Sequence, residues 1–311
     1  MIEFVNVYKS YQKVKAASAI SFQLKENNVF GVIGPEHSGK TTILKICAGL
    51  VRPDEGIVLR DNKNIFDNPR DHGRRIGYMP QKPGIYEELT VREYLEFYAR
   101  IYGMDERSSY RAGEIWMDKT GIREYADMTM DMLTQETKQY VGLTRCMIHQ
   151  PELFILDEPF QNLNRDSRFK MFELIMKLKR DGTTILISSD SMEEMEELCS
   201  EIAVLENGRI VVSGSVEEVI KEVNISRPLM IKVLNKVDEA VMLLKENPYV
   251  RNISISGCRI AVRFDGEEKI EAQLLNLLVQ KGIPVSSFVR EKGRMEDVIS
   301  KVSTTATGGI L

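Results

Sequence analysis

A glycine-rich loop between an apolar run and a helix-like segment constrains the fold of this chain more than any other feature. The run NNVFGVIG (27–34) is typical of a buried strand, and GKTTILKICAGL (39–50) has the spacing of a helix with one apolar face. Between them, GPEHSGKTT (34–42) matches the pattern G-x-x-x-x-G-K-[ST]. A strand, a tight loop and a helix in this order predict an α/β fold with a phosphate-binding loop.

The spacing within this loop gives each residue type a role. Glycines let backbone N–H groups turn toward a phosphate, Lys40 supplies a cation for the terminal phosphates, and Thr41 places a hydroxyl on Mg²⁺. The N-terminus of the following helix adds its dipole. The predicted nucleotide-binding residues of the loop are Gly34, Pro35, Glu36, His37, Ser38, Gly39, Lys40, Thr41 and Thr42.

A second apolar run ends in two acids. LFILDE (153–158) predicts a buried strand that delivers Asp157 to the coordination sphere of Mg²⁺. Glu158 follows directly, where it can orient or deprotonate an attacking water. Taken by itself, the run is equally consistent with a strand that ends in two solvated acids. Together with the phosphate loop, it predicts a nucleotide-hydrolysing site with Glu158 as the catalytic residue.

Composition excludes several other classes of protein. The formal net charge of −4 implies no broad basic surface for nucleic acid. The four cysteines are scattered without a CxxC pair, which argues against a zinc site or a disulfide framework and suits the cytosol. No run of about 18 apolar residues exists, and the N-terminus lacks an apolar signal core. We therefore expect any membrane role to depend on a partner chain.

The pattern of predicted helices and strands changes after about residue 222, which predicts two domains. We expect a large α/β domain at 1–222 with a helical subdomain at about 83–150, whose first helix begins at the capping box TVRE (90–93). An Asn-Gly pair in LENGRIVV (205–212) predicts a hairpin. After a linker at 223–228, residues 229–303 show a βαββαβ order that predicts a small ferredoxin-like domain, with its hairpin turn at Ser256-Gly257 and a last helix at 294–302. The tail, 304–311, is predicted to be disordered.

These motifs resemble the ATP-binding subunits of ABC transporters over residues 1 to about 220. The resemblance implies ATP and Mg²⁺ as ligands and places Tyr11 where the family stacks an aromatic ring on adenine. It also implies that Gln81, in IGYMPQKPGIYEELTVREYLEFYARIYG (76–103), reaches the metal and senses a membrane subunit. The competing interpretation, which would gain weight if the two nucleotide motifs were absent, is that Tyr11 and Gln81 are ordinary surface residues. The amino-acid sequence of this stretch most resembles the ATP-binding subunits of exporters that move drugs, lipids or antibiotics.

The segment LTQET (133–137) departs from the family pattern LSGGQ, which one subunit presents to the nucleotide of the other. Thr134 keeps a hydroxyl, whereas Gln135 and Glu136 replace two glycines and Thr137 follows them. Glu136 brings a negative charge toward a phosphate, and two like unit charges about 4 Å apart repel by roughly 4 kcal/mol at an effective dielectric constant near 20. The competing interpretation is that LTQET is an ordinary helix cap.

Two further positions depart from the family in the same direction. Asn164, in PFQNLNRD (159–166), stands where the resemblance implies an aspartate, and Asp190 stands where it implies a histidine that contacts the γ-phosphate. A carboxylate at position 190 would repel that phosphate unless it is protonated. The residues that hold ATP and Mg²⁺ within the chain are therefore intact, while those that close a dimer and drive turnover are altered. We expect firm binding of ATP and slow hydrolysis.

Three functions fit these observations. The first is an ATP-binding subunit at the cytoplasmic face of the membrane, which drives a transmembrane permease as part of an exporter. The second is a regulatory subunit that pairs with a more competent ABC ATPase, so the chain would form a heterodimer rather than a homodimer. The third, a soluble ABC protein of translation or DNA repair, fits poorly, because those proteins carry two such domains or a long coiled coil. The small domain is predicted to regulate or stabilise a dimer, or only to pack.

Overall fold

The computed structural model describes residues 1–220, 228–266 and 268–290. The chain divides into two compact units, Met1–Val216 and Glu217–Leu311. Most of the predicted linker, the predicted helix at 294–302 and the predicted tail lie outside the described residues. Within the described part of the chain, no helix has both the length and the apolar character needed to cross a membrane.

The first unit contains two sheets. One has the order β2-β1-β4-β5 and the other the order β10-β9-β3-β8-β7-β6. The strands of the first sheet are β1 (Ile2–Tyr11), β2 (Val14–Leu24), β4 (Glu55–Arg60) and β5 (Lys63–Asn64). Those of the second sheet are β3 (Val29–Ile33), β6 (Ile76–Met79), β7 (Leu153–Asp157), β8 (Thr184–Ser189), β9 (Glu201–Glu206) and β10 (Arg209–Ser215).

The second sheet is parallel from β6 to β9, and only β10 pairs antiparallel. Its central strands β3 and β7 are buried along their whole length, as their continuous apolar sequences require. Helix α1 (Lys40–Cys47) lies between the two sheets, and Ile43, Leu44 and Ile46 join the core there. This packing fixes the start of α1 at the carboxyl end of β3, where parallel sheets bind ligands.

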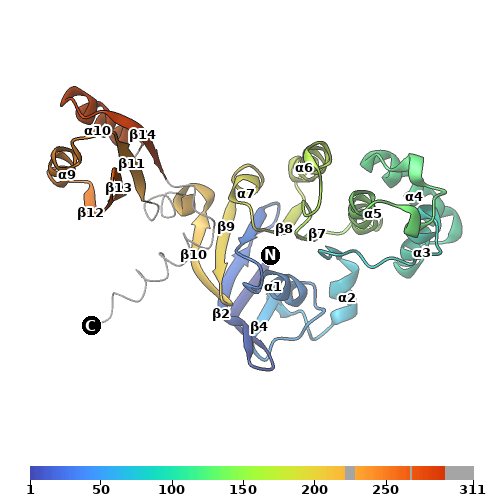
Figure 1. Cartoon of the computed structure of the whole chain (residues 1–311). Helices are drawn as coiled ribbons and strands as arrows, with labels where there is room; N and C mark the ends of the chain where they lie inside the picture. Colours follow the sequence, from blue (N-terminus) through green and yellow to red (C-terminus); the bar gives the residue numbers. More distant parts are fainter. Residues whose placement is uncertain (221–227, 267, 291–311) are drawn as a thin grey trace. The chain divides into compact units, whose positions relative to one another are not determined.

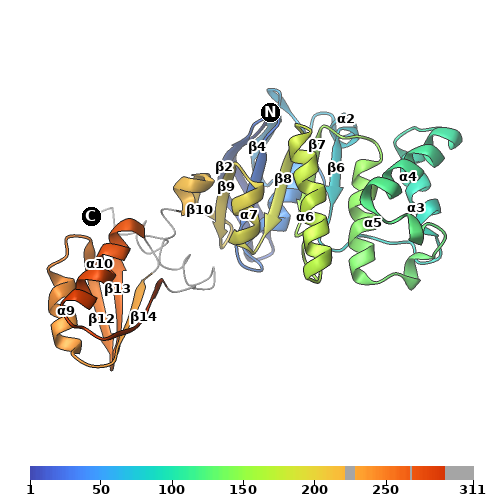
Figure 2. The ribbon, with the colours of Figure 1, turned by 90° about the horizontal axis from the view of Figure 1, so that it is seen from above.

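The other helices of this unit pack on the second sheet or form a separate segment. Helices α6 (Arg165–Arg180) and α7 (Met192–Leu198) lie on the face of the second sheet that is turned away from α1, as Figures 1 and 2 show together. A separate helical segment consists of α3 (Val91–Ile101), α4 (Glu106–Thr120) and α5 (Gln135–Met147). The short helix α2 (Pro69–Arg74) precedes β6.

Several local predictions are confirmed and others need correction. Thr90 and Glu93 form the predicted capping box at the start of α3, and Asn207 and Gly208, both with positive φ, turn the β9–β10 hairpin. Helix α1 ends at Cys47 rather than at Leu50. The chain leaves the helix at Gly49, whose φ of +73° suits a residue without Cβ.

The second unit has the predicted βαββαβ order. Its elements are β11 (Leu229–Val233), α9 (Val237–Lys245), β12 (Val250–Ser256), β13 (Arg259–Phe264), α10 (Glu268–Gln280) and β14 (Val285–Arg290). The strands form an antiparallel sheet of order β12-β13-β11-β14, the ferredoxin-like arrangement. The β12–β13 turn is Gly257-Cys258, one residue later than predicted, because Ser256 still pairs with Arg259.

Candidate nucleotide-binding site

The phosphate loop connects the carboxyl end of β3 to the first turn of α1. Gly39 has a φ of +107°, and a Cβ at this position would lie 2.1 Å from the carbonyl oxygen of Ala16. A Cβ at Gly34 would lie 2.3 Å from the carbonyl oxygen of Leu205. These two glycines are therefore required by contacts with the chain's own backbone, in addition to any approach of a phosphate.

Lys40 lies under this loop and is almost fully buried. Its Nζ donates to the carbonyl oxygens of Gly34 at 2.6 Å and Pro35 at 3.0 Å. The same Nζ is 3.0 Å from a carboxylate oxygen of Glu158, whose side chain is 12% exposed. The ammonium group thus stands between the loop and the acid that follows β7.

Asp157, at the end of β7, is fully buried. Its Oδ1 accepts hydrogen bonds from the hydroxyls of Ser188, at 2.8 Å, and Thr41, at 3.2 Å. Its Oδ2 is buried without a hydrogen-bond partner among the described residues. Burial raises the pKa of this carboxyl, and the hydrogen bonds from Ser188 and Thr41 oppose that rise. A carboxylate oxygen without a partner beside a threonine hydroxyl fits the donor set that Mg²⁺ prefers.

Glu158 has a φ of +49°, which is rare for a residue with a side chain. The left-handed conformation turns the carboxylate out of the strand and toward Lys40, and its backbone N–H donates to the Ser188 hydroxyl. Burial raises the pKa of Glu158, the ammonium of Lys40 lowers it, and the carboxylate of Asp190 raises it. A basic carboxylate held in a fixed position suits a general base.

A cavity of about 350 Å³ opens above these groups. Of the residues predicted from sequence, those that line it are Glu36, His37, Ser38, Gly39, Lys40, Thr41, Thr42, Gln81, Glu158 and Asp190. Three lining residues were not predicted, namely Val14, Ala16 and Gln161. Tyr11 is not among the lining residues; it is 45% exposed at the end of β1 and pairs with Val14 across the β1–β2 hairpin. Its contact with adenine stays a prediction.

The segment Leu133–Thr137 begins helix α5. Thr134 is its N-cap, and its hydroxyl accepts from the backbone N–H of Thr137. The carboxylate of Glu136 is directed toward its own chain, because it accepts hydrogen bonds from the backbone N–H and the side-chain amide of Asn164, at 2.8 and 3.0 Å, and from the Ser167 hydroxyl at 3.0 Å. From the sequence we expected the Glu136 carboxylate to face a phosphate. In the structure, the carboxylate is instead hydrogen-bonded to Asn164 and Ser167 of its own chain.

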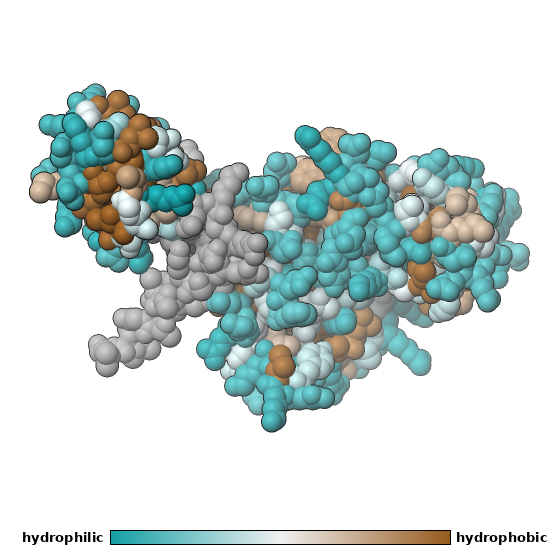
Figure 3. Space-filling model, viewed as in Figure 1, coloured by the Kyte–Doolittle hydropathy of each residue, from teal (hydrophilic) through white to brown (hydrophobic). Residues whose placement is uncertain are grey.

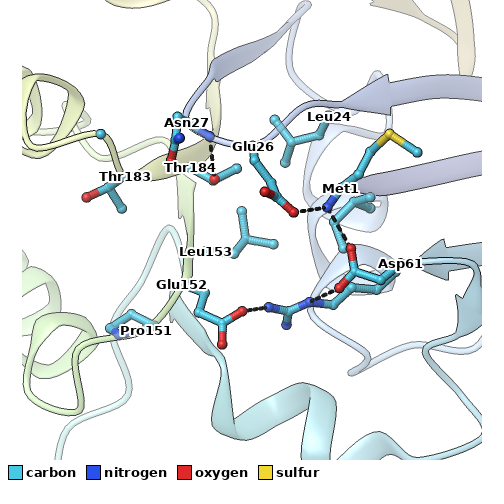
Figure 4. Close-up of a pocket in the computed structure, with 13 residues that line it drawn as sticks. Met1, Leu24, Glu26, Asn27, Asp61, Pro151, Glu152, Leu153, Thr183 and Thr184 are labelled. Atoms are coloured by element: carbon cyan, nitrogen blue, oxygen red, sulfur yellow. Dashed lines mark hydrogen bonds and ion pairs between the residues drawn. The ribbon is translucent and has the colours of Figure 1, made fainter.

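A second cavity, of about 400 Å³, lies at the opposite end of the parallel strands (Figure 4). It is lined by Leu153 and Thr184, which begin β7 and β8. The N-terminal ammonium of Met1 bridges the carboxylates of Glu26 and Asp61 there, at 3.0 Å from each. Since these charges pair with one another and the carboxyl ends of the strands face the other way, this cavity is not the nucleotide site.

Comparisons with known proteins agree with this geometry. Residues 17–161 match the family model described as ABC transporter. The chain is 31% identical to the uncharacterized ABC transporter ATP-binding protein YhaQ of Bacillus subtilis over 219 residues, which cover 70% of this chain and 72% of the relative. The chain belongs to the ABC transporter ATP-binding proteins. The Nod factor export ATP-binding protein I of Burkholderia orbicola is 28% identical over 97% of this chain and 96% of its own length.

The fold of this ABC transporter ATP-binding protein is also found in solved structures. The ATP-binding cassette MJ0796, in a dimeric post-hydrolysis state bound to ADP and Pi, superposes with a TM-score of 0.65 and 23% identity. It covers 70% of this chain and 99% of its own length. The first unit therefore has the P-loop fold of the ABC-type ATP-binding cassettes, which is the fold that the sequence predicted.

Proposed function

We propose that this chain is the ATP-binding subunit of an ABC export complex, that it binds Mg-ATP in the cavity above Lys40 and Glu158, and that it hydrolyses ATP slowly. The observation that carries the proposal is the convergence of Lys40, Glu158 and the Thr41–Asp157 pair at one end of the parallel sheet. The similarity to a Nod factor export protein over nearly the whole chain supports export as the direction.

Each group of the site has a role in this reaction. Lys40 neutralises the terminal phosphates, and Glu158 orients and deprotonates the attacking water. Thr41 and Asp157 would hold Mg²⁺ with Gln81, which lines the same cavity. The metal would neutralise charge on the β- and γ-phosphates. The buried surroundings of Glu158 keep its carboxylate basic enough to accept a proton.

The proposed slow turnover rests on position 190 and on the start of α5. Asp190 lines the cavity and adds a second carboxylate near Glu158, which raises the pKa of Glu158 and disfavours a phosphate oxygen close by. At the start of α5, the exposed side chain of Gln135 stands where the family pattern has a glycine. Both changes reduce the stabilisation of the transferred phosphoryl group in the transition state. Losing one hydrogen-bond donor to such a transition state typically costs about 10²–10³ in rate.

The segment 82–103 is the proposed docking surface for a membrane permease. Tyr86, Phe97 and Ile101 are 51%, 41% and 60% exposed, and the rings of Tyr86 and Phe97 meet edge to face at 5.5 Å. In the region formed by α3, α4 and α5, hydrophobic residues reach the surface in places (Figure 3). An exposed apolar cluster of this kind marks an interaction site. Docking there would place the chain at the cytoplasmic face of the membrane.

The altered positions also favour a second candidate function, a regulatory subunit that pairs with a more competent ABC ATPase. Purification of the tagged chain from its native host in mild detergent separates the two. A single membrane protein in the complex supports the exporter subunit, whereas an additional ATP-binding chain in equal amount supports the regulatory subunit. A Phe97→Asp variant should release the membrane protein, while Phe169→Asp, a change of an equally apolar exposed residue on α6, should retain it.

A further inference from the structure

The start of α5 and the loop before α6 are tied together by one hydrogen-bonded cluster. Glu136, in the first turn of α5, accepts three hydrogen bonds from Asn164 and Ser167. One turn further along the same face of α5, the Tyr140 hydroxyl donates to the carbonyl oxygen of Ser167. Both contacts join the helical segment to α6, which packs on the sheet.

Asn164 uses both ends of its amide in this cluster. Its Oδ1 accepts from the backbone N–H of Ser167, at 2.9 Å, and so caps α6. Its Nδ2 donates to Glu136 at 3.0 Å. Aspartate would cap the helix about as well as asparagine. However, its side chain has no N–H to donate, and it would set a second carboxylate against Glu136. Asparagine therefore fits this position because Glu136 stands opposite.

We propose that Glu136 and Asn164 are a matched pair of positioning residues, which holds the first turn of α5 and the loop before α6 as one rigid edge of the ATPase domain. Both residues depart from the family pattern, and the two departures belong together because the amide of Asn164 donates to the carboxylate of Glu136. The effect on ATP turnover rests on the proposed function. In that function, the first turn of α5 and the loop before α6 both contact a second nucleotide-binding domain and have to keep a fixed position relative to each other. The contact itself does not depend on that function.

The next contact along α5 extends this edge toward the nucleotide cavity. The Gln139 side chain, which is 4% exposed, donates to the backbone carbonyl oxygen of Gln81 at 3.1 Å. Gln81 lines the cavity. Helix α5 thus contacts Gln81 as well as Ser167, so a loose attachment at Glu136 would also disturb the position of Gln81.

The test is a swap cycle in the full-length protein with the variants Asn164→Asp, Glu136→Gln and the double variant. Asn164→Asp keeps the helix cap and places two carboxylates together, so it should lower both the thermal midpoint and Mg-ATP turnover, turnover by about tenfold or more. The double variant restores one amide and one carboxylate in reversed positions. Its turnover should return to within about twofold of the Glu136→Gln variant.

A pH series separates positioning from a general loss of structure. In Asn164→Asp, lowering the pH should protonate one carboxyl of the pair, which then donates the missing hydrogen bond. Turnover relative to the parent should therefore rise from pH 8 to pH 6. The proposal would be overturned if Asn164→Asp lowered turnover equally in the parent and in the Glu136→Gln variant, or lowered it in neither. It would also be overturned if the double variant recovered stability but not turnover. If the parent neither binds nor hydrolyses ATP, the proposed function fails, and the stability cycle still decides the pair.

Discussion

Lys40 and Glu158 form an ion pair with 3.0 Å between nitrogen and oxygen, and their side chains are only 7% and 12% exposed. The two backbone carbonyls that also accept from Lys40 keep its ammonium at the mouth of the phosphate loop. A phosphate that enters the cavity would meet this cation, and the carboxylate of Glu158 lines the same cavity. Lys40, the cation for the phosphates, and Glu158, the base for the attacking water, therefore hold each other in position.

The first prediction concerns binding. Lys40→Ala removes the buried cation at the loop and should cost about 2–5 kcal/mol of Mg-ATP affinity, the usual loss when one partner of a desolvated charged pair is truncated. Isothermal titration with Mg-ATP measures this directly. Lys63→Ala, on the exposed strand β5, is the matched control and should bind like the parent. Unchanged affinity of the Lys40→Ala variant would show that the nucleotide binds elsewhere.

The second prediction concerns stability against pH. The pKa of Glu158 is raised in the folded protein, so its contribution to stability is fully present below the ordinary carboxyl pKa and is lost as the pH rises through the raised value. Glutamine cannot ionise and has nearly the same shape. Glu158→Gln should therefore melt at a higher temperature than the nucleotide-free parent at pH 8.

The difference in melting temperature should shrink as the pH falls toward 5, because the parent then carries a neutral Glu158. Thermal unfolding at several pH values, followed by circular dichroism, measures this. Glu88→Gln, a change of an exposed glutamate, serves as the control and should follow the parent. A constant gap between Glu158→Gln and the parent at every pH would contradict the raised pKa.

The third prediction compares two glycines that both have positive φ. At Gly121, with φ of +74°, an added Cβ meets no atom within 4 Å, so Gly121→Ala should cost only the conformational penalty of about 1–2 kcal/mol. At Gly39, the added Cβ would also meet the carbonyl oxygen of Ala16 at 2.1 Å. Denaturant unfolding should show a clearly larger loss for Gly39→Ala. Equal losses would mean that the loop moves away from Ala16 at little cost.

Much of the fold follows from local patterns in the sequence. The phosphate loop and the pair Asp157-Glu158 could be predicted because their residues are contiguous and adjoin strands with continuous apolar runs. The βαββαβ order of the second unit was also readable, because its helices and strands differ in periodicity. The domain boundaries and the nucleotide contacts stay predictions.

What the sequence did not show depends on packing between distant segments. Val14, Ala16 and Gln161 reach the cavity only because the β1–β2 hairpin and the loop after β7 fold over the phosphate loop. No periodicity links these positions. Likewise, Glu136 and Asn164 were read as two separate departures from a family pattern, although they bond to each other across 28 residues of chain. A single sequence offers no signal for such a pair.

The last prediction restores the residues implied by the family pattern. Asp190→His, combined with Gln135→Gly and Glu136→Gly, should raise ATPase activity by at least about tenfold, which corresponds to about 1.4 kcal/mol of barrier. Histidine at position 190 can donate to a phosphate oxygen, whereas a carboxylate repels it, and glycines at the start of α5 allow a closer approach. Glu136→Gly also removes the contacts with Asn164 and Ser167 and should by itself lower turnover. Asp190→His with Gln135→Gly alone should therefore be faster than the triple variant, and the three changes should not simply add.

Steady-state phosphate release from the purified full-length proteins measures the effect. Asp181→His, at the exposed end of α6, is the matched control for adding a histidine and should leave the rate unchanged. Glu158→Gln in the restored background should remove the gain, because the base is then missing. If the parent already turns over ATP briskly and the restored protein is no faster, the residues at 135, 136 and 190 do not slow catalysis, and the active site tolerates Asp190 beside Glu158.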